Sequence, residues 1–243
     1  MDKQKKTTVH SLSLPYPEPQ WPPISTENEQ AILRFLLPLL QPVGDFRRAH
    51  VPRSKGKGRP RKANNDKKED SLPTWMPDVY DHLTVGFNST VRRLESLARG
   101  QKPQILVDDT DVEQPEPGVN LSVVLVCREN LPDIMTSTLP LLIATSASKP
   151  TRAKLVNISA EAEEQIAQAL YQRRIGVLGI DVETVGAETL LHFIQNTIAT
   201  VDVPWLDQIS PPVYHPVKVN TVVTAAKTKP AATGRKRKRL GNG

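Results

Sequence analysis

The chain has 243 residues, with 32 Lys and Arg side chains against 26 Asp and Glu and a formal net charge of +6 at pH 7. This length allows one good-sized domain or two small ones. The single cysteine, Cys127, excludes an internal disulfide framework and a cluster of thiolate zinc ligands. Without an apolar run of about 18 residues or a secretory signal, we expect an intracellular protein that does not span a membrane.

The positive charge is concentrated in two segments. Between residues 45 and 70, ten basic side chains accompany four acidic ones, and residues 214–243 hold eight basic side chains and no acid. The rest of the chain therefore carries a net charge of about −8. We expect a Pro-rich extended segment at 1–24, a folded domain at 25–205 with a disordered basic insertion at 46–71, and a disordered basic tail at 206–243.

The first half of the expected domain contains two helices. Thr26 and Glu29 fit a capping box, and apolar side chains follow at helical spacing until residues 42–44, Pro-Val-Gly, which we expect to end this helix. The second helix should begin with Asn88 as its N-cap and stop at Gly100.

The second half alternates strands with helices. Residues 121–127 form a nearly continuous apolar run, which is typical of a strand covered on both faces. Residues 154–158 and 175–180 predict two more strands, and Ser159 is a suitable cap for the helix between them. A closing helix follows at residues 190–198. The alternation predicts a layered α/β/α domain.

No catalytic constellation stands out, so we expect no catalytic residue, no metal and no cofactor. A phosphate-binding loop and a nucleophile elbow are both missing, and the five histidines lack metal-ligand spacing. Cys127 lies in the most apolar strand and should be an inert core thiol. We interpret the acidic residues 108–111 as a solvated loop, since they lack the Gly and distal Glu of a calcium loop.

Residues 86–93 are the candidate binding site. Gly86 permits close backbone approach, and the start of the helix offers N–H groups and a positive dipole end to a phosphate. Asn88 and Arg92 lie on one helix face, where the first can pair with a base edge and the second with the backbone. The alternative is that Asn88 only caps the helix and Arg92 only pairs with Glu95.

The basic segments have their own interpretations. A nuclear-import signal is predicted in the tail, at Arg235, Lys236, Arg237, Lys238 and Arg239. Residues 57–62, Lys-Gly-Arg-Pro-Arg-Lys, resemble a hook that binds the minor groove of A·T-rich DNA. A nonspecific phosphate-binding arm is the alternative interpretation of this segment.

Several motifs occur in the order found in the kink-turn-binding ribosomal protein superfamily. They are Gly86-x-Asn88-x-x-x-Arg92-x-x-Glu95, the strand 123–126 followed by Glu129, the Leu-Pro-x-Ile at Leu131, the Leu-Pro-Leu-Leu at Leu139, and the strand 174–178. Within that superfamily the chain is most similar to the fungal protein subunit of nuclear ribonuclease P and ribonuclease MRP (Pop-three). The cues include Leu-Thr-Val-Gly-Phe-Asn-Ser-Thr at 83–90 and Arg-Arg-Ile-Gly-Val-Leu-Gly at 173–179.

The resemblance implies a three-layer α/β/α sandwich with a small mixed sheet. It also implies a non-catalytic RNA-binding subunit acting in tRNA 5′-leader and rRNA processing, in the nucleus and nucleolus, where RNA performs the catalysis. Its partners would be the RNAs of ribonuclease P and MRP and the other protein subunits. The implied RNA-binding residues are Gly86, Asn88, Ser89, Arg92, Arg93, Arg173 and Arg174.

Two positions depart from the family pattern, which usually has Glu at the position of Ser89 and Lys at the position of Arg92. The resemblance therefore leaves open whether the bound RNA is a kink-turn. The alternatives are a chromatin-associated DNA-binding adaptor that uses residues 57–62, another kink-turn-binding protein of a nucleolar ribonucleoprotein, and a small hydrolase or transferase on an unrecognised α/β fold.

Overall fold

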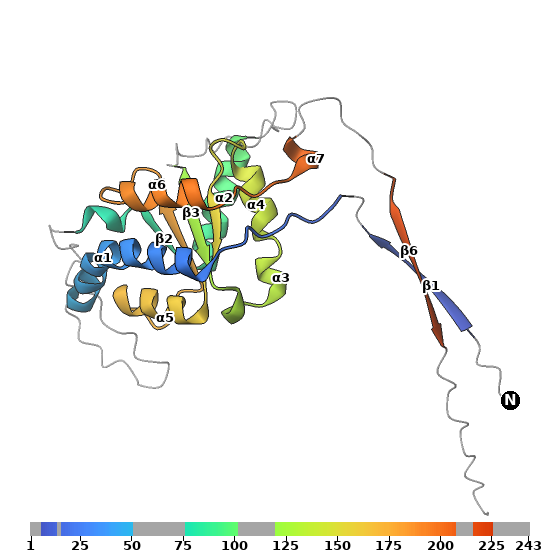
Figure 1. Ribbon diagram of the computed structural model, residues 1–243, viewed down its shortest axis with the longest axis horizontal. Helices are drawn as coiled ribbons and strands as arrows, with labels where there is room; N and C mark the ends of the chain where they lie inside the picture. The colour runs from blue at the N-terminus through green and yellow to red at the C-terminus, as the bar shows by residue number, and fades with distance from the viewer. Residues whose placement is uncertain (1–5, 14–15, 51–75, 102–119, 208–215, 226–243) are drawn as a thin grey trace, which may run out of the picture. The chain divides into compact units, whose positions relative to one another are not determined.

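The computed structural model describes residues 6–13, 16–50, 76–101, 120–207 and 216–225 (Figure 1). The chain divides into two compact units, a main unit within residues 19–211 and a smaller one made by residues 1–18 and 212–243. The basic segment 57–62, the acidic residues 108–111 and the predicted import signal at 235–239 lie outside the described residues. None of the described helices is long and apolar enough to cross a membrane.

The main unit is built on a four-stranded mixed sheet. Its strands are β2 (Leu83–Val85), β5 (Val177–Asp181), β3 (Leu121–Val126) and β4 (Lys154–Asn157), side by side in that order. Strand β5 runs antiparallel to both β2 and β3, whereas β3 and β4 are parallel. All residues of β3 are buried, which confirms the predicted strand covered on both faces.

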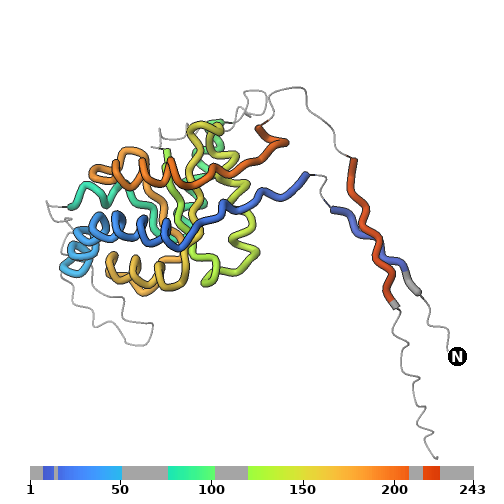
Figure 2. Tube along the Cα trace, in the orientation of Figure 1, coloured from blue at the N-terminus to red at the C-terminus, as the bar shows by residue number. Residues whose placement is uncertain are grey.

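Helices cover both faces of this sheet (Figures 1 and 2). One face packs against α1 (Thr26–His50), α5 (Ala160–Ala169) and α6 (Glu188–Thr197), and the other against α2 (Phe87–Gly100) and α4 (Leu139–Ser146). Alternate side chains of β3 enter the two cores, because successive residues of a strand point to opposite faces. Val123 belongs to the first core and Val124 to the second. The expected three-layer α/β/α sandwich is confirmed.

Short helical turns complete the unit. They are η1 (Asp78–Tyr80), η3 (Arg128–Asn130), α3 (Asp133–Thr136) and α7 (Pro204–Asp207). Strand β4 and the cap of α5 agree with the sequence prediction, since the Ser159 hydroxyl accepts a hydrogen bond from the Ala162 N–H at 3.2 Å.

The first helix is longer than predicted. It passes through Pro38 and Pro42 to His50, so residues 46–50 belong to the helix and not to the basic insertion. Each proline removes one backbone hydrogen bond. Val43 and Phe46 are nevertheless buried in the core, and this packing maintains the helix. Gly44 lies against α5 so closely that a Cβ there would overlap the carbonyl oxygen of Ala169.

The predicted capping box at the start of α1 is wrong by one residue. Ser25 is the cap, and its hydroxyl accepts a hydrogen bond from the Asn28 N–H at 3.2 Å. Glu29 instead reaches the start of α5, where its carboxylate accepts the Ser159 N–H at 2.6 Å. Glu29 therefore connects α1 with the start of α5 and does not close a capping box within α1.

The smaller unit contains a strand pair that the sequence analysis missed. Strand β1 (Lys6–Ser13) pairs antiparallel with β6 (Lys218–Ala225), with Val9 opposite Val222. The sequence predicted an extended segment at 1–24, which agrees with an extended strand, and a disordered tail at 206–243 in which it indicated no strand. Both strands are rich in Thr and Val, which favour strands, but each is too short and polar to indicate a strand without its distant partner.

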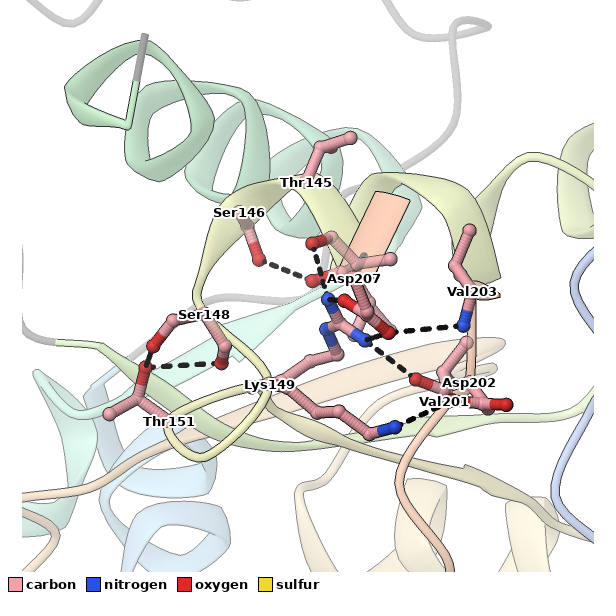
Figure 3. Close-up of polar contacts among 12 residues, drawn as sticks. Thr145, Ser146, Ser148, Lys149, Thr151, Val201, Asp202, Val203 and Asp207 are labelled. Carbon is pink, nitrogen blue, oxygen red and sulfur yellow. Dashed lines mark hydrogen bonds and ion pairs between the residues drawn. The ribbon is translucent and has the colours of Figure 1, made fainter. Parts of the chain in front are cut away.

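Arg152 binds the segment that leads into α7 and the last residue of that helix, and Figure 3 labels its partners Val201 and Asp207. Arg152 is only 3% exposed. It donates to the carbonyls of Val201 at 2.7 Å and Ala144 at 3.0 Å, and its fork meets both carboxylate oxygens of Asp207 at 2.7 and 3.1 Å. The hydrogen bond from Arg152 lowers the pKa of the Asp207 carboxyl below its ordinary value. Arg152 thus connects α4, through the Ala144 carbonyl, with α7, through Asp207.

Replacing Gly44 by Ala tests the contact between α1 and α5. The added methyl group would push against backbone that cannot rotate away, so we expect a loss of about 1–3 kcal/mol in the free energy of unfolding. Gly100→Ala is the matched control, because a Cβ there meets nothing within 4 Å. It should be neutral or stabilising by up to about 1 kcal/mol in urea unfolding followed by circular dichroism. Equal effects of the two changes would contradict the close packing.

Replacing Arg152 by Met should lower the free energy of unfolding by about 3 kcal/mol, because two carbonyls and a largely buried carboxylate lose the hydrogen bonds that Arg152 donates. Since the pKa of Asp207 is lowered by folding, its stabilising effect should be full above about pH 4 and be lost as the pH falls below that. The control is Lys149→Met, which removes an exposed partner of Asp202. That change should have little effect. Similar unfolding curves for the two variants would refute the role of Arg152.

Candidate nucleic-acid interface

The sheet topology brings the segments that follow β2 and β3 and precede β5 to one edge. Val85 pairs with Leu178 and Val126 pairs with Val177, so the ends of β2 and β3 meet the beginning of β5. Two backbone hydrogen bonds extend this arrangement beyond the strands. The Gly86 N–H donates to the Val177 carbonyl at 2.8 Å, and the Cys127 N–H donates to the Gly176 carbonyl at 2.9 Å.

Gly86 forms the turn into α2. Its φ is +96°, in the region that favours glycine, although a Cβ there would meet nothing within 4 Å. Glycine is therefore required by the backbone conformation and not by space. The carbonyl of Gly86 accepts the N–H and the hydroxyl of Thr90 at 3.1 and 3.0 Å, and these bonds hold the turn.

Asn88 is not the N-cap of α2, as the sequence suggested. The helix begins at Phe87, Gly86 occupies the cap position, and no side chain caps this end. Gly100, expected to follow the helix, is its last residue. Since the first N–H groups of a helix lack partners within it, this end can receive an external anion.

Asn88, Ser89 and Arg92 are exposed on the first turns of α2. In the described part of the chain, Asn88 makes no capping bond and Arg92 forms no ion pair with Glu95. The alternative in which both residues have only these local roles is therefore not what the structure contains.

Arg93, unlike the exposed Arg92, is half-buried and pairs with a carboxylate of β5. Its guanidinium is 3.4 Å from Asp181 Oδ2, and the His82 ring is 4.0 Å from the same atom. Burial raises the pKa of the Asp181 carboxyl, and the nearby Arg93 and His82 partly oppose this rise. The contact ties α2 to β5, so Arg93 has a structural role, and its contact with RNA stays a prediction.

Arg173 and Arg174 are exposed in the loop between α5 and β5. The loop begins at Tyr171, which has a left-handed conformation with φ of 54° and lies 5.2 Å from the guanidinium of Arg48. It ends at Gly176, where a Cβ would come within 3.1 Å of the Leu131 side chain. Close packing explains this glycine.

Arg128 is a basic residue at the same edge that the site prediction missed. It is exposed directly after β3, and its guanidinium lies 4.9 Å from the ring centre of Trp21. The sequence contained a signal that could have identified Arg128, because a basic residue directly after a buried strand must lie at the edge of the sheet where that strand ends. Exposed guanidinium groups beside an uncapped helix start can bind phosphate groups.

The described residues at this edge give little support for metal binding or for a reactive thiol. Within the described ranges, no group of three or more His, Cys, Asp and Glu side chains could hold a metal ion. Cys127 is fully buried, and burial raises the pKa of its thiol above the ordinary value, with the carboxylates of Glu163 and Glu129 adding to the rise.

Fold and edge together define a small α/β/α module that presents a helix start and arginine side chains on one side. The family model for RNase P subunit Pop3 matches residues 67–208, which is more than half of the chain. The chain belongs to the Pop3 family and is thus a protein subunit of ribonuclease P. A comparison with curated proteins finds no match.

The burial of Cys127 predicts slow reaction with thiol reagents. At pH 7 the native chain should be labelled much more slowly than the chain in urea, because the thiol is buried and protonated. The raised pKa also implies that the free energy of unfolding falls as the pH rises above about 8.5, since the unfolded thiol ionises first. Cys127→Ala should remove this decline. Labelling of the folded chain at the unfolded rate would contradict the prediction.

Proposed function

We propose that this subunit binds structured RNA in ribonuclease P, and in ribonuclease MRP, through the sheet edge at the start of α2. The observation that carries the proposal is that the strand ends next to the uncapped start of α2 and next to the loop of the exposed Arg173 and Arg174 pair with each other, so both segments lie at one edge of the sheet. Membership in the Pop3 family supports the identity of the RNA. In this proposal the chain has no catalytic role and supports tRNA 5′-leader and rRNA processing.

The residues at the edge divide into two roles. The exposed arginines contact phosphate groups, which provide affinity but no sequence information. Asn88 and Ser89 contact base edges, because an amide and a hydroxyl can donate and accept hydrogen bonds. Arg93 supports the site by holding α2 against β5. A serine at position 89 brings no charge, so RNA binding depends more on the arginines than in a site with Glu at that position.

The charge distribution supports a focused contact. Outside its two basic segments the chain is acidic, with a net charge of about −8, so bulk attraction cannot hold RNA against the body. Contact must therefore occur where cations are concentrated. The basic segments at 53–62 and 235–239 would add nonspecific phosphate contacts, and the latter would direct nuclear import. We propose the nucleus, including the nucleolus, as the location.

Arg92→Ala tests the site directly. The change should weaken binding of the full-length chain to a transcript of its organism's ribonuclease P RNA by about 1–3 kcal/mol and lower the salt slope by about 1. Arg99→Ala is the matched control, since Arg99 is exposed at the other end of the same helix. The measurement is a filter-binding titration at several salt concentrations. Equal losses of RNA affinity for both variants would contradict the site, because they would show that only the net charge of the chain matters.

The complex itself provides a second test. Purification of the intact chain from its cells, followed by sequencing of the bound RNA, should recover the RNAs of ribonuclease P and MRP. An Asn88→Ala/Arg92→Ala variant should recover less of both if the edge makes the contact. Recovery of genomic DNA instead of these RNAs would favour a chromatin adaptor.

A further inference from the structure

Glu163 is a buried carboxylate that the proposed RNA contacts do not use. It lies in α5 and is only 4% exposed. Its Oε1 accepts the backbone N–H of Ile175 at 2.9 Å, and its Oε2 accepts the side-chain amide of Asn130. Ile175 is itself 2% exposed, so this hydrogen bond is removed from solvent.

Stability alone is a poor reason for a carboxylate at this position. A charged group loses much of its hydration when it is buried, and it is normally compensated by a cation. Both donors to Glu163 among the described residues are neutral. Its buried neighbours on α5 are Ala162, Ile166 and Ala167, so an apolar side chain would suit the surroundings. The carboxylate is, however, well suited to receive donors from two different segments.

Those two segments belong to the proposed RNA-binding edge. Ile175 directly follows Arg173 and Arg174, and Asn130 follows Arg128 by two residues. One carboxylate therefore connects the loop before β5 with the turn after β3. On its other side the loop is held at Tyr171, which faces Arg48. Arg173 and Arg174 thus lie on a short stretch of backbone that is anchored at both ends.

We propose that Glu163 is a positioning residue that holds the loop of Arg173 and Arg174 in the orientation in which these arginines contact RNA. The inference rests on the proposed function. The proposal predicts the direction in which RNA affinity changes when the Glu163 carboxylate is removed. By net charge alone, removal of a carboxylate should strengthen RNA binding, whereas loss of a positioning residue should weaken it.

The test is a double-mutant cycle in the full-length chain, with a transcript of its ribonuclease P RNA as the probe. Glu163→Ala should weaken binding about ten-fold and lower the salt slope by about 1–2, as loss of one or two phosphate contacts would. In an Arg173→Ala/Arg174→Ala background, the same change should have almost no effect, because the arginines that it positions are gone. A general loss of stability would persist in both backgrounds.

Three further variants sharpen the interpretation. Glu163→Gln keeps an acceptor for Ile175, and the Asn130 amide can rotate to match it, so binding should stay within about two-fold of the original. Glu164→Ala removes an exposed carboxylate from the same helix and should leave binding unchanged or slightly stronger. If Glu163→Ala fails to fold, Asn130→Ala removes one of the two bonds and should weaken binding about three-fold, with the same dependence on the arginines.

The outcomes separate the two proposals. If Arg173→Ala/Arg174→Ala retains full affinity, these arginines do not bind this RNA, and both the site and the inference fail. If that variant loses affinity while Glu163→Ala does not, the RNA site stands and the positioning role is overturned. An equal loss from Glu163→Ala with and without the arginines would also overturn it. Faster hydrogen exchange of the Ile175 amide in Glu163→Ala is expected in the free chain.

Discussion

The direction of strand β5 is the constraint on which the candidate interface depends. Because β5 lies between β2 and β3 and runs antiparallel to both, its beginning meets the ends of its two neighbours. Hence the turn into α2, the turn after β3 and the loop after α5 all open on one edge. A parallel β5 would place Arg173 and Arg174 at the opposite edge of the sheet. The strand order thus determines which cations can act together.

Buried polar side chains then hold the segments around this framework. The Glu29 carboxylate accepts the N–H of Ser159, the cap residue of α5. The Glu163 carboxylate accepts the N–H of Ile175, which precedes β5. Arg152 supplies donors where these carboxylates supply acceptors. Its guanidinium donates hydrogen bonds to a carbonyl of α4 and to a carbonyl of the segment before α7. Each of these groups satisfies backbone atoms that would otherwise be costly to bury. The acidic character of the body comes partly from carboxylates that have such structural roles.

This arrangement supports the proposed role in a ribonucleoprotein for a basic chain whose residues outside the two basic segments are acidic. The exposed Arg92, Arg173 and Arg174 come from segments that share one edge of the sheet with an uncapped helix start. Phosphate binding at such a place requires little net charge, because the helix dipole and the guanidinium groups act at short range.

Local signals in the sequence determined much of the fold. The apolar run of β3, the alternation of strands and helices, and the Ser159 cap follow from neighbouring residues, because burial on both faces and capping are local properties. The candidate residues Gly86, Asn88 and Arg92 were also identifiable from their spacing. Only the tertiary structure decided the length of α1, the pairing of β1 with β6, and the different environments of Arg92 and Arg93. These depend on packing, strand pairing and ion pairs between residues far apart in the chain, such as Arg93 with Asp181, and no local pattern contains that information.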